Sequence, residues 1–283
     1  MTHGARSNRR GFLTAIAITA SGPLIPRNAF AQHSTANAGL LNSDVCLLTP
    51  EVTEGPYYFD PKLVRPNIAE GKQGVPITLL LQVVDEHCKP LNGARVDIWH
   101  CDATGVYSNY PGQGDDSEHP ISTEGQSFLR GTQLADPQGV VRFQSIYPGW
   151  YPGRTPHIHF KVFIDSKNVL TGQIFFPDAL SEYIYQNVPP YSSRKHSRDT
   201  LNSDDSIAIE ATRASYANVK EETGHYLVSM IIGANPNSTH DAERKGRTTG
   251  SPPASGPGPS ANKNRTPQDR LDALVPRART KLE

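Results

Sequence analysis

The sequence predicts an all-β protein, an antiparallel β-sandwich with long loops, one short helix and a disordered C-terminal tail. Three observations predict this class. Runs rich in β-branched and aromatic residues recur roughly every ten to fifteen residues. Turn-forming segments such as HCKPLNG and ADPQG separate these runs. A long helical periodicity is absent from the sequence before residue 178.

Individual elements follow from the same patterns. The stretch DALSEYIYQ, residues 178–186, has the apolar spacing of one short helix. Residues 187–223 contain Pro-Pro, Ser-Ser and Asn-Ser-Asp-Asp clusters, so we expect a long irregular excursion there. The predicted strands cover residues 77–86, 94–101, 127–134, 139–146, 157–164, 169–176 and 224–232.

The N-terminal segment, residues 1–31, is typical of a twin-arginine export signal. It contains an RR pair, an apolar run that begins FLTAIAITA, and the small-residue cleavage site AFA. A short membrane anchor is the alternative, but polar residues, Gly and Pro interrupt the run, which falls short of the about 20 residues that a span needs. We therefore expect export, cleavage near Ala31, no stable membrane anchor after cleavage, and a periplasmic or secreted protein.

The rest of the chain divides into three parts. Residues 32–45 are predicted to be a linker and residues 46–235 the folded domain. Residues 236–283 are rich in Pro, Gly, Ser and Arg and lack Phe, Tyr and Trp. Such a tail cannot bury enough apolar surface to order itself, although its LDALV stretch could form a brief helix.

Charge is distributed unevenly along the chain. The whole sequence is formally neutral, with 28 Lys+Arg and 28 Asp+Glu, but acidic residues dominate the predicted domain and basic residues dominate the tail. An acidic domain argues against a nucleic-acid partner, because phosphate backbones are bound by basic surfaces.

Three cysteines occur, at positions 46, 88 and 101. In an oxidising compartment two of them could form a disulfide, which would leave the third as a free thiol. Sequence alone leaves the pairing of Cys46, Cys88 and Cys101 open. Their spacing is unlike that of a zinc site.

The strand HIHFKVFI, residues 157–164, carries two histidines on one face. Its even-numbered positions are uniformly apolar, so that face should lie on the core. His157, His159, Lys161 and Phe163 occupy the opposite face. The two imidazoles are about 7 Å apart along the backbone and could bind one metal ion. A His-x-His pair is by itself a weak metal signal, and an ordinary polar strand surface is the alternative.

The donors near these histidines are phenols rather than carboxylates. No acidic residue occurs between Asp136 and Asp165, whereas Tyr147 and Tyr151 lie just before the histidines and Tyr107 follows an earlier strand. A phenol has a pKa of about 10, so binding it as phenolate at neutral pH requires a strongly charged cation such as Fe(III). The alternative is that these tyrosines pack at the edge of the core and form hydrogen bonds through their hydroxyls.

Several segments together resemble a known family. They are TEGPYY, VDIWHCDATGVYSNY, FLRGTQLADPQGVVRFQSIYPGWYPGRTPHIHF and GQIFF, in that order. This order and spacing resemble the intradiol ring-cleavage dioxygenases, the family of catechol and protocatechuate dioxygenases. The resemblance spans residues 46 to about 185.

The resemblance implies a non-haem Fe(III) cofactor bound by Tyr107, Tyr151, His157 and His159. It also implies that Tyr151 is the ligand that substrate displaces. Arg154 and Gln173 would then face the bound ring, Arg154 as a fixed cation and Gln173 as a polar partner. The TEGP segment resembles one that folds over the pocket in this family, and a simple Gly-Pro turn is its alternative.

The implied reaction consumes a catechol-type substrate and O2. The ring opens between its two hydroxylated carbons, and both oxygen atoms enter a muconate-type diacid product. Tyr151 and a bound hydroxide would accept the two protons of the diol. No long helical dimerisation segment precedes TEGPYY, so we do not expect the homodimer built on such a segment, although an oligomer of another kind remains possible.

Two other functions are consistent with parts of the sequence. A cupin-like or copper enzyme could use the same His-x-His pair and recruit His100 or His119 as a further ligand. An exported β-sandwich could instead bind carbohydrate or phenolic ligands through exposed Tyr and Trp without catalysis.

Overall fold

The structure is a computed structural model that describes residues 47–114, 116, 118–239, 272 and 274. The predicted export signal, the linker at residues 32–45 and most of the predicted tail lie outside these ranges. Asp272 and Leu274 are helical, at the position where LDALV could form a brief helix. None of the helices in the described ranges has the length and apolar character that crossing a membrane would require.

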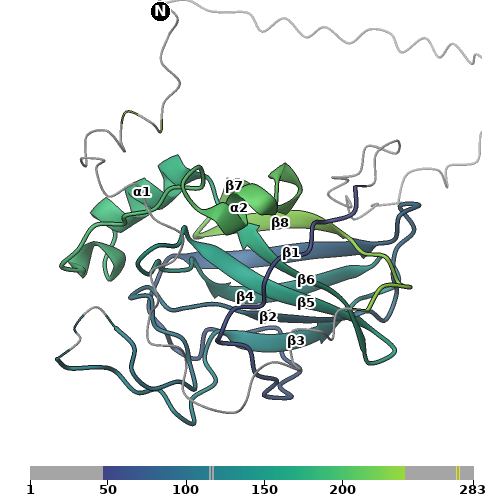
Figure 1. The fold of residues 1–283 in the computed structure, drawn as a ribbon, viewed down its shortest axis with the longest axis horizontal. Helices are drawn as coiled ribbons and strands as arrows, with labels where there is room; N and C mark the ends of the chain where they lie inside the picture. Colours follow the sequence, from purple (N-terminus) through teal and green to yellow (C-terminus); the bar gives the residue numbers. More distant parts are fainter. Residues whose placement is uncertain (1–46, 115, 117, 240–271, 273, 275–283) are drawn as a thin grey trace, which may run out of the picture. The chain divides into compact units, whose positions relative to one another are not determined.

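Two four-stranded sheets form a β-sandwich in the described part of the chain (Figure 1). One sheet has the strand order β4-β1-β8-β7 and the other β3-β2-β5-β6. All seven predicted strands are present, with ends that shift by a few residues, so the predicted fold class is confirmed. The bounds are β1 Pro76–Val84, β2 Arg95–Trp99, β3 Arg130–Leu134, β4 Val140–Ile146, β5 His157–Ile164, β6 Lys167–Phe175, β7 Asn218–Glu222 and β8 His225–Gly233.

The region between β6 and β8 contains more structure than the sequence predicted. The expected helix is α1, Asp178–Asn187, and it is followed by α2, Ser206–Glu210, and by short 3-10 turns at Tyr191–Ser193 and Arg213–Ser215. The excursion then ends in β7, which the sequence analysis missed because NVKEE is charged and largely exposed.

One strand pair departs from the antiparallel pattern. β1 and β8 run parallel, with Leu79 opposite Val228, whereas the other pairs between named strands are antiparallel. Parallel neighbours need a long connection. These two strands have most of the domain between them in sequence, so their direction was not constrained by a hairpin.

The core lies between the two sheets and contains the even-numbered side chains of β5, as predicted. Ile158, Phe160 and Val162 are each 0% exposed. They belong to one cluster with residues of the opposite sheet such as Leu79 and Phe143. Burying side chains of this size stabilises a fold by about 1.5 to 3 kcal/mol each, which fixes which face of β5 points inward.

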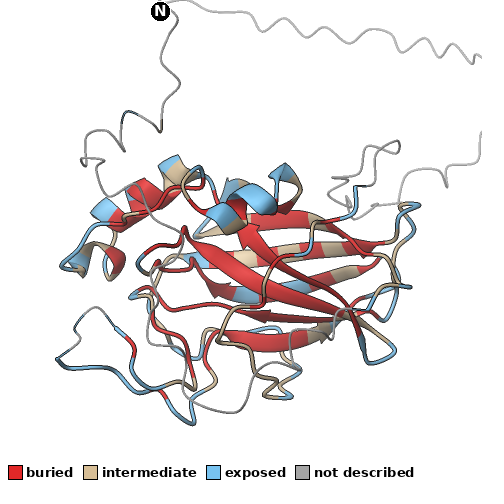
Figure 2. Ribbon diagram, viewed as in Figure 1, coloured by how far each residue is buried: buried red, intermediate tan, exposed pale blue. Residues whose placement is uncertain are grey.

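The other face of β5 is also buried, as the red strands of Figure 2 show. Residues 52–58, here called the strap, cover it. Figure 1 shows this segment in dark purple as it crosses the strands of the β3-β2-β5-β6 sheet. The Val52 amide donates to the Thr171 carbonyl at 3.1 Å, and the Lys161 ammonium pairs with the Glu54 carboxylate. His157, His159 and Lys161 therefore lie in a closed layer between strap and sheet rather than on a solvent-facing strand surface.

The cysteines separate into two kinds. Cys101 is a buried free thiol, and Cys88 is disulfide-bonded. Cys46 lies outside the described residues.

Candidate metal centre

The two histidines of β5 point their Nε2 atoms toward each other. These atoms are 3.0 Å apart, and both rings are buried. The Nδ1 atom of His157 lies 2.7 Å from the Thr155 carbonyl, so it carries the proton and leaves Nε2 with a free lone pair. The His159 ring is oriented by stacking on Trp99, its register partner on β2, with ring centroids 4.8 Å apart.

Two tyrosine hydroxyls reach the same point from separate loops. Tyr107, which follows β2, places its Oη 3.4 Å from His157 Nε2 and 3.2 Å from His159 Nε2. Tyr151, which precedes β5, places its Oη 3.1 Å from His157 Nε2. The four side chains predicted as ligands thus converge on one point.

Burial sets the protonation of this cluster. It lowers the pKa of both imidazoles well below the usual range, and the charge of Arg154 lowers it further. It raises the pKa of Tyr107 well above the usual value and that of Tyr151 to about 12, with Arg154 opposing the rise at Tyr151. Both imidazoles are therefore neutral, which is their metal-binding form, whereas the phenols would ionise only beside a strong cation.

The four donor atoms fit a trivalent metal ion such as Fe(III). Two donors about 2.1 Å from one ion, at angles of 90 to 110°, are about 3.0 to 3.4 Å apart, which matches the separations above. Two phenolates and two neutral imidazoles leave Fe(III) with one net positive charge. Among the described residues, no group of three or more His, Cys, Asp or Glu side chains is placed to bind a metal ion, so a centre here depends on the two phenols.

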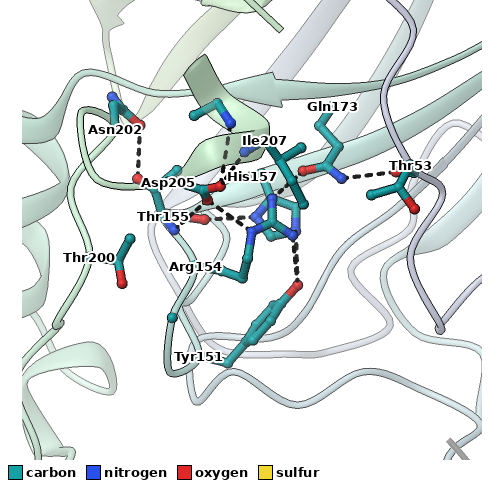
Figure 3. Close-up of polar contacts among 12 residues, drawn as sticks. Thr53, Tyr151, Arg154, Thr155, His157, Gln173, Thr200, Asn202, Asp205 and Ile207 are labelled. Atoms are coloured by element: carbon teal, nitrogen blue, oxygen red, sulfur yellow. Dashed lines mark hydrogen bonds and ion pairs between the residues drawn. The ribbon is translucent and has the colours of Figure 1, made fainter. Parts of the chain in front are cut away.

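Arg154 and Gln173 border the same cluster, as Figure 3 shows. The Nη1 atom of Arg154 lies 3.3 Å from Tyr151 Oη, and its Nη2 donates to Gln173 Oε1 at 2.5 Å. Gln173 is the register partner of His159 on β6, and its Nε2 donates to the Thr53 carbonyl of the strap at 3.0 Å. The structure therefore brings together all six residues that the sequence analysis selected.

Comparison with known proteins identifies the family. A sequence model described as Dioxygenase matches residues 53–201, more than half of the chain. A solved structure, the intradiol ring-cleavage dioxygenase of Tetranychus urticae, is 33% identical with a TM-score of 0.63, and the match covers 69% of this chain and 98% of that one. The chain belongs to the intradiol ring-cleavage dioxygenases.

Curated members of the family are similar over shorter regions. The protocatechuate 3,4-dioxygenase beta chain of Burkholderia cepacia is 34% identical over 143 residues, which cover 46% of this chain and 58% of that subunit. A catechol 1,2-dioxygenase of Pseudomonas sp. (strain EST1001) is 35% identical over 108 residues, which cover 36% of this chain and 32% of that enzyme. The chain thus matches between about a third and three fifths of the length of these two relatives.

Other residues considered from the sequence lie elsewhere in this dioxygenase. Tyr147 is fully buried in the core, where its hydroxyl bonds Ser181 at 2.7 Å, so of the two tyrosines that flank PGW only Tyr151 reaches the centre. His100 is held 2.7 Å from the Ser145 hydroxyl, and the side chain of His119 is 81% exposed beside Asp116. Neither histidine supplies the extra ligand that a cupin-like site would need.

The sequence analysis missed two residues that hold this arrangement in place. Asp205 accepts hydrogen bonds from Arg154 Nε at 2.8 Å and from the Thr155 amide at 3.0 Å. Gln113 bonds both the amide and the carbonyl of Tyr107, each at 2.7 Å. An Asp before the short run SIAIE is a recognisable helix N-cap signal, but nothing in the sequence indicates that it also contacts Arg154.

Proposed function

We propose that this chain is a non-haem Fe(III) dioxygenase that cleaves a catechol-type ring between its two hydroxylated carbons and yields a muconate-type diacid. The observation that carries the proposal is the convergence of two phenol oxygens and two imidazole nitrogens at 3.0 to 3.4 Å, inside a domain of the intradiol family. Tyr107, Tyr151, His157 and His159 would hold the metal ion.

Bound Fe(III) would hold both oxygens of the diol and make the ring reactive toward O2, whose two atoms both enter the product. Tyr151 is partly exposed, so it would be able to leave the metal ion when substrate binds. Its Oη atom would then accept one proton from the substrate. Arg154 presents Nη1 beside that oxygen and would stabilise negative charge on the substrate. A single preorganised donor of this kind is worth on the order of 3 kcal/mol in a transition state.

The strap would exclude water from the reaction. Its Tyr57 ring stacks on the ring of Tyr107 with centroids 4.3 Å apart. Its Gly55 lies so close to the His159 ring that an added Cβ would be 3.3 Å from Cε1. A closed, dry layer strengthens every charge interaction within it.

We also propose that the protein is exported by the twin-arginine route to the periplasm or the exterior. Two features support this proposal, the RR-containing N-terminal pattern and the disulfide at Cys88, since disulfides persist in oxidising compartments. Replacing Arg9 and Arg10 by Lys should retain the protein in the cytoplasm, as measured by cell fractionation.

The proposed chemistry is tested by metal content, colour and oxygen uptake. Iron-loaded protein should show a visible tyrosinate-to-Fe(III) absorption band. It should consume O2 with at least one member of a panel of catechol, protocatechuate, hydroxyquinol and chlorinated catechols. With ¹⁸O2, both labelled atoms should enter a diacid opened between the hydroxyls. A colourless iron-loaded protein, or cleavage beside the hydroxyls, would contradict the proposal, and copper or zinc in the purified protein would favour a cupin-like enzyme.

A further inference from the structure

Asp205 lies where the excursion after β6 returns to the metal centre. It immediately precedes α2 and is 0% exposed. Its two carboxylate oxygens have different partners. Oδ1 accepts the amides of Ile207 and Ala208, at 2.9 and 3.3 Å, and thereby caps the helix. Oδ2 accepts from Arg154 Nε at 2.8 Å and from the Thr155 amide at 3.0 Å (Figure 3).

We propose that Asp205 is a positioning residue for the dioxygenase reaction, because it fixes the guanidinium of Arg154 directly and the imidazole of His157 through the Thr155 peptide. This inference rests on the proposed function for its catalytic consequence. The geometry that it describes belongs to the protein itself and can be measured without iron.

The shape of the Arg154 side chain determines how its contacts orient it. A guanidinium is planar and its donors point in fixed directions. Asp205 holds Nε, and Gln173 holds Nη2 at 2.5 Å. Two fixed donors and a rigid plane determine where the third nitrogen points. Nη1 consequently lies 3.3 Å from Tyr151 Oη and 3.5 Å from His157 Nε2, where the proposed reaction needs a cation.

One peptide unit, that of Thr155, connects Asp205 to His157. Asp205 accepts the Thr155 amide hydrogen, and the Thr155 carbonyl accepts the proton of His157 Nδ1 at 2.7 Å. The Thr155 hydroxyl also donates to Asn202 Oδ1 at 2.8 Å, so the segment that carries Asp205 contacts this residue twice. Groups that orient a metal-binding histidine through its second nitrogen typically change metal affinity or activity about 10- to 100-fold when removed.

Charge supports the same role. Arg154 is only 7% exposed, and a buried cation requires a counter-charge. Asp205 supplies it in a direct ion pair whose two side chains are 9% and 0% exposed. A carboxylate that only capped α2 would not need to be charged, because Asn caps helices as well as Asp does.

The decisive variant is Asp205→Asn. Its carbonyl oxygen can still cap α2, but its amide nitrogen would face the donors of Arg154 and Thr155 and could not accept from them. The matched control is Asp136→Asn, the same change at an exposed carboxylate that accepts two backbone amides, those of Gln138 and Val140.

With catechol as the probe, we expect Asp205→Asn to lower kcat about 10- to 100-fold. The control should leave kcat unchanged. Because Asp205 acts in part through Arg154, the double variant Asp205→Asn/Arg154→Met should lose less activity than the product of the two single losses. Independent losses that multiply in the double variant, or a kcat for Asp205→Asn equal to that of the wild type, would overturn the inference.

A second measurement uses the metal-free wild-type protein. The Nε–H signal of Arg154 in ¹⁵N NMR, assigned by its absence in Arg154→Lys, should exchange slowly with solvent. It should become fast in Asp205→Asn and stay slow in Asp136→Asn. Fast exchange in the wild-type protein overturns the inference even if the Asn variant does not fold. Slow exchange in a wild-type protein that lacks both colour and activity would refute the proposed function and retain the placement of Arg154.

Discussion

The two tyrosines of the candidate centre are held very differently. Tyr107 is 1% exposed and its backbone is bonded on both sides, whereas Tyr151 is partly exposed and precedes an exposed proline in a tight turn. Tyr107 is therefore more tightly restrained than Tyr151. The difference lies in the loops, since both hydroxyls reach the same His157 nitrogen, at 3.4 and 3.1 Å.

Three side chains, those of Gln113, Thr123 and Arg130, form hydrogen bonds to the Tyr107 loop. Gln113 bonds the amide and carbonyl of Tyr107, and the Thr123 hydroxyl donates to the same carbonyl at 2.6 Å. Arg130 holds the next residue, because its Nε donates to the Ser108 hydroxyl at 2.7 Å and its Nη2 to the Ser108 carbonyl at 3.0 Å.

The backbone of Tyr151 itself has fewer hydrogen bonds than that of Tyr107, although Arg194 donates to the carbonyl of the preceding Trp150 at 2.5 Å. Its turn is closed by the Arg154 amide, which donates to the Tyr151 carbonyl at 3.1 Å. Gly153, with φ of +80°, donates its amide to the Asp199 carboxylate at 3.1 Å. This contrast supports the proposal that substrate displaces Tyr151 and that Tyr107 keeps the metal in place. It also suggests experiments on each loop separately.

The largest expected effect comes from replacing each of the two tyrosines by Phe. We expect Tyr107→Phe to lower iron affinity and activity more than about 100-fold. Removing a residue that only orients a metal ligand typically costs about 10- to 100-fold, and removing the ligand itself should cost more. Tyr151→Phe should retain more iron, since three fixed donors remain. Metal analysis and the visible band measure both outcomes. Equal iron loss in the two variants would remove the distinction between a fixed and a releasable tyrosine.

His100, which lies just before the Tyr107 loop, should make the stability of the fold depend on pH. Burial lowers the pKa of His100 to about 4, with smaller opposing contributions from the Cys101 carbonyl and Asp102. The unfolded chain, with a pKa near 6.5, therefore binds more protons between about pH 6.5 and 4. The contribution of His100 to the free energy of unfolding should be fully present above pH 6.5 and fall by about 3 kcal/mol as pH drops to 4.

His100→Gln removes this titration, so its Tm should depend less on pH across the same window. Thermal unfolding of both proteins from pH 7 to 4 gives the comparison. Parallel curves would show that His100 does not titrate as burial requires.

Gln113→Leu should loosen Tyr107 without removing a ligand. It leaves the buried Tyr107 amide without its acceptor, at a cost of about 1 to 3 kcal/mol in stability. We expect activity to fall about 10- to 100-fold and the tyrosinate band to shift. Gln138→Leu, the same change at an exposed position, should alter neither. An unchanged band in Gln113→Leu would mean that the loop holds Tyr107 without this amide.

The smallest expected effect is at Gly153. An alanine there must adopt a positive φ, which costs about 1 to 2 kcal/mol for an ordinary residue. Gly153→Ala should lower Tm slightly and change kcat more than iron content, because the proposed reaction requires the release of Tyr151. Gly93→Ala, at a φ of +75° where an added Cβ would meet no atom within 4 Å, is the matched control for backbone strain alone. A larger iron loss than in Tyr151→Phe would contradict this ranking.

Much of the fold could be read from local pattern. Alternation along residues 157–164 determined which face of β5 enters the core, and the resemblance of its motifs selected six residues that the structure places together. The features that the sequence did not predict depend on contacts between segments that are far apart in the chain. β7 is a charged edge strand without an apolar face, and the burial of His157 and His159 depends on a strap about a hundred residues earlier in the chain.

The sequence by itself determined seven of the eight strands in the described residues, the inward face of β5 and the residue types able to bind a ferric ion, because these depend on neighbours a few positions away. Only the tertiary structure decided that Asp205 holds Arg154 and that Gln113 holds Tyr107. A buried hydrogen bond can be made by any donor and acceptor that the fold brings within about 3 Å, whatever their separation along the chain. The local sequence pattern therefore does not predict contacts between residues such as Asp205 and Arg154, which lie far apart in the chain.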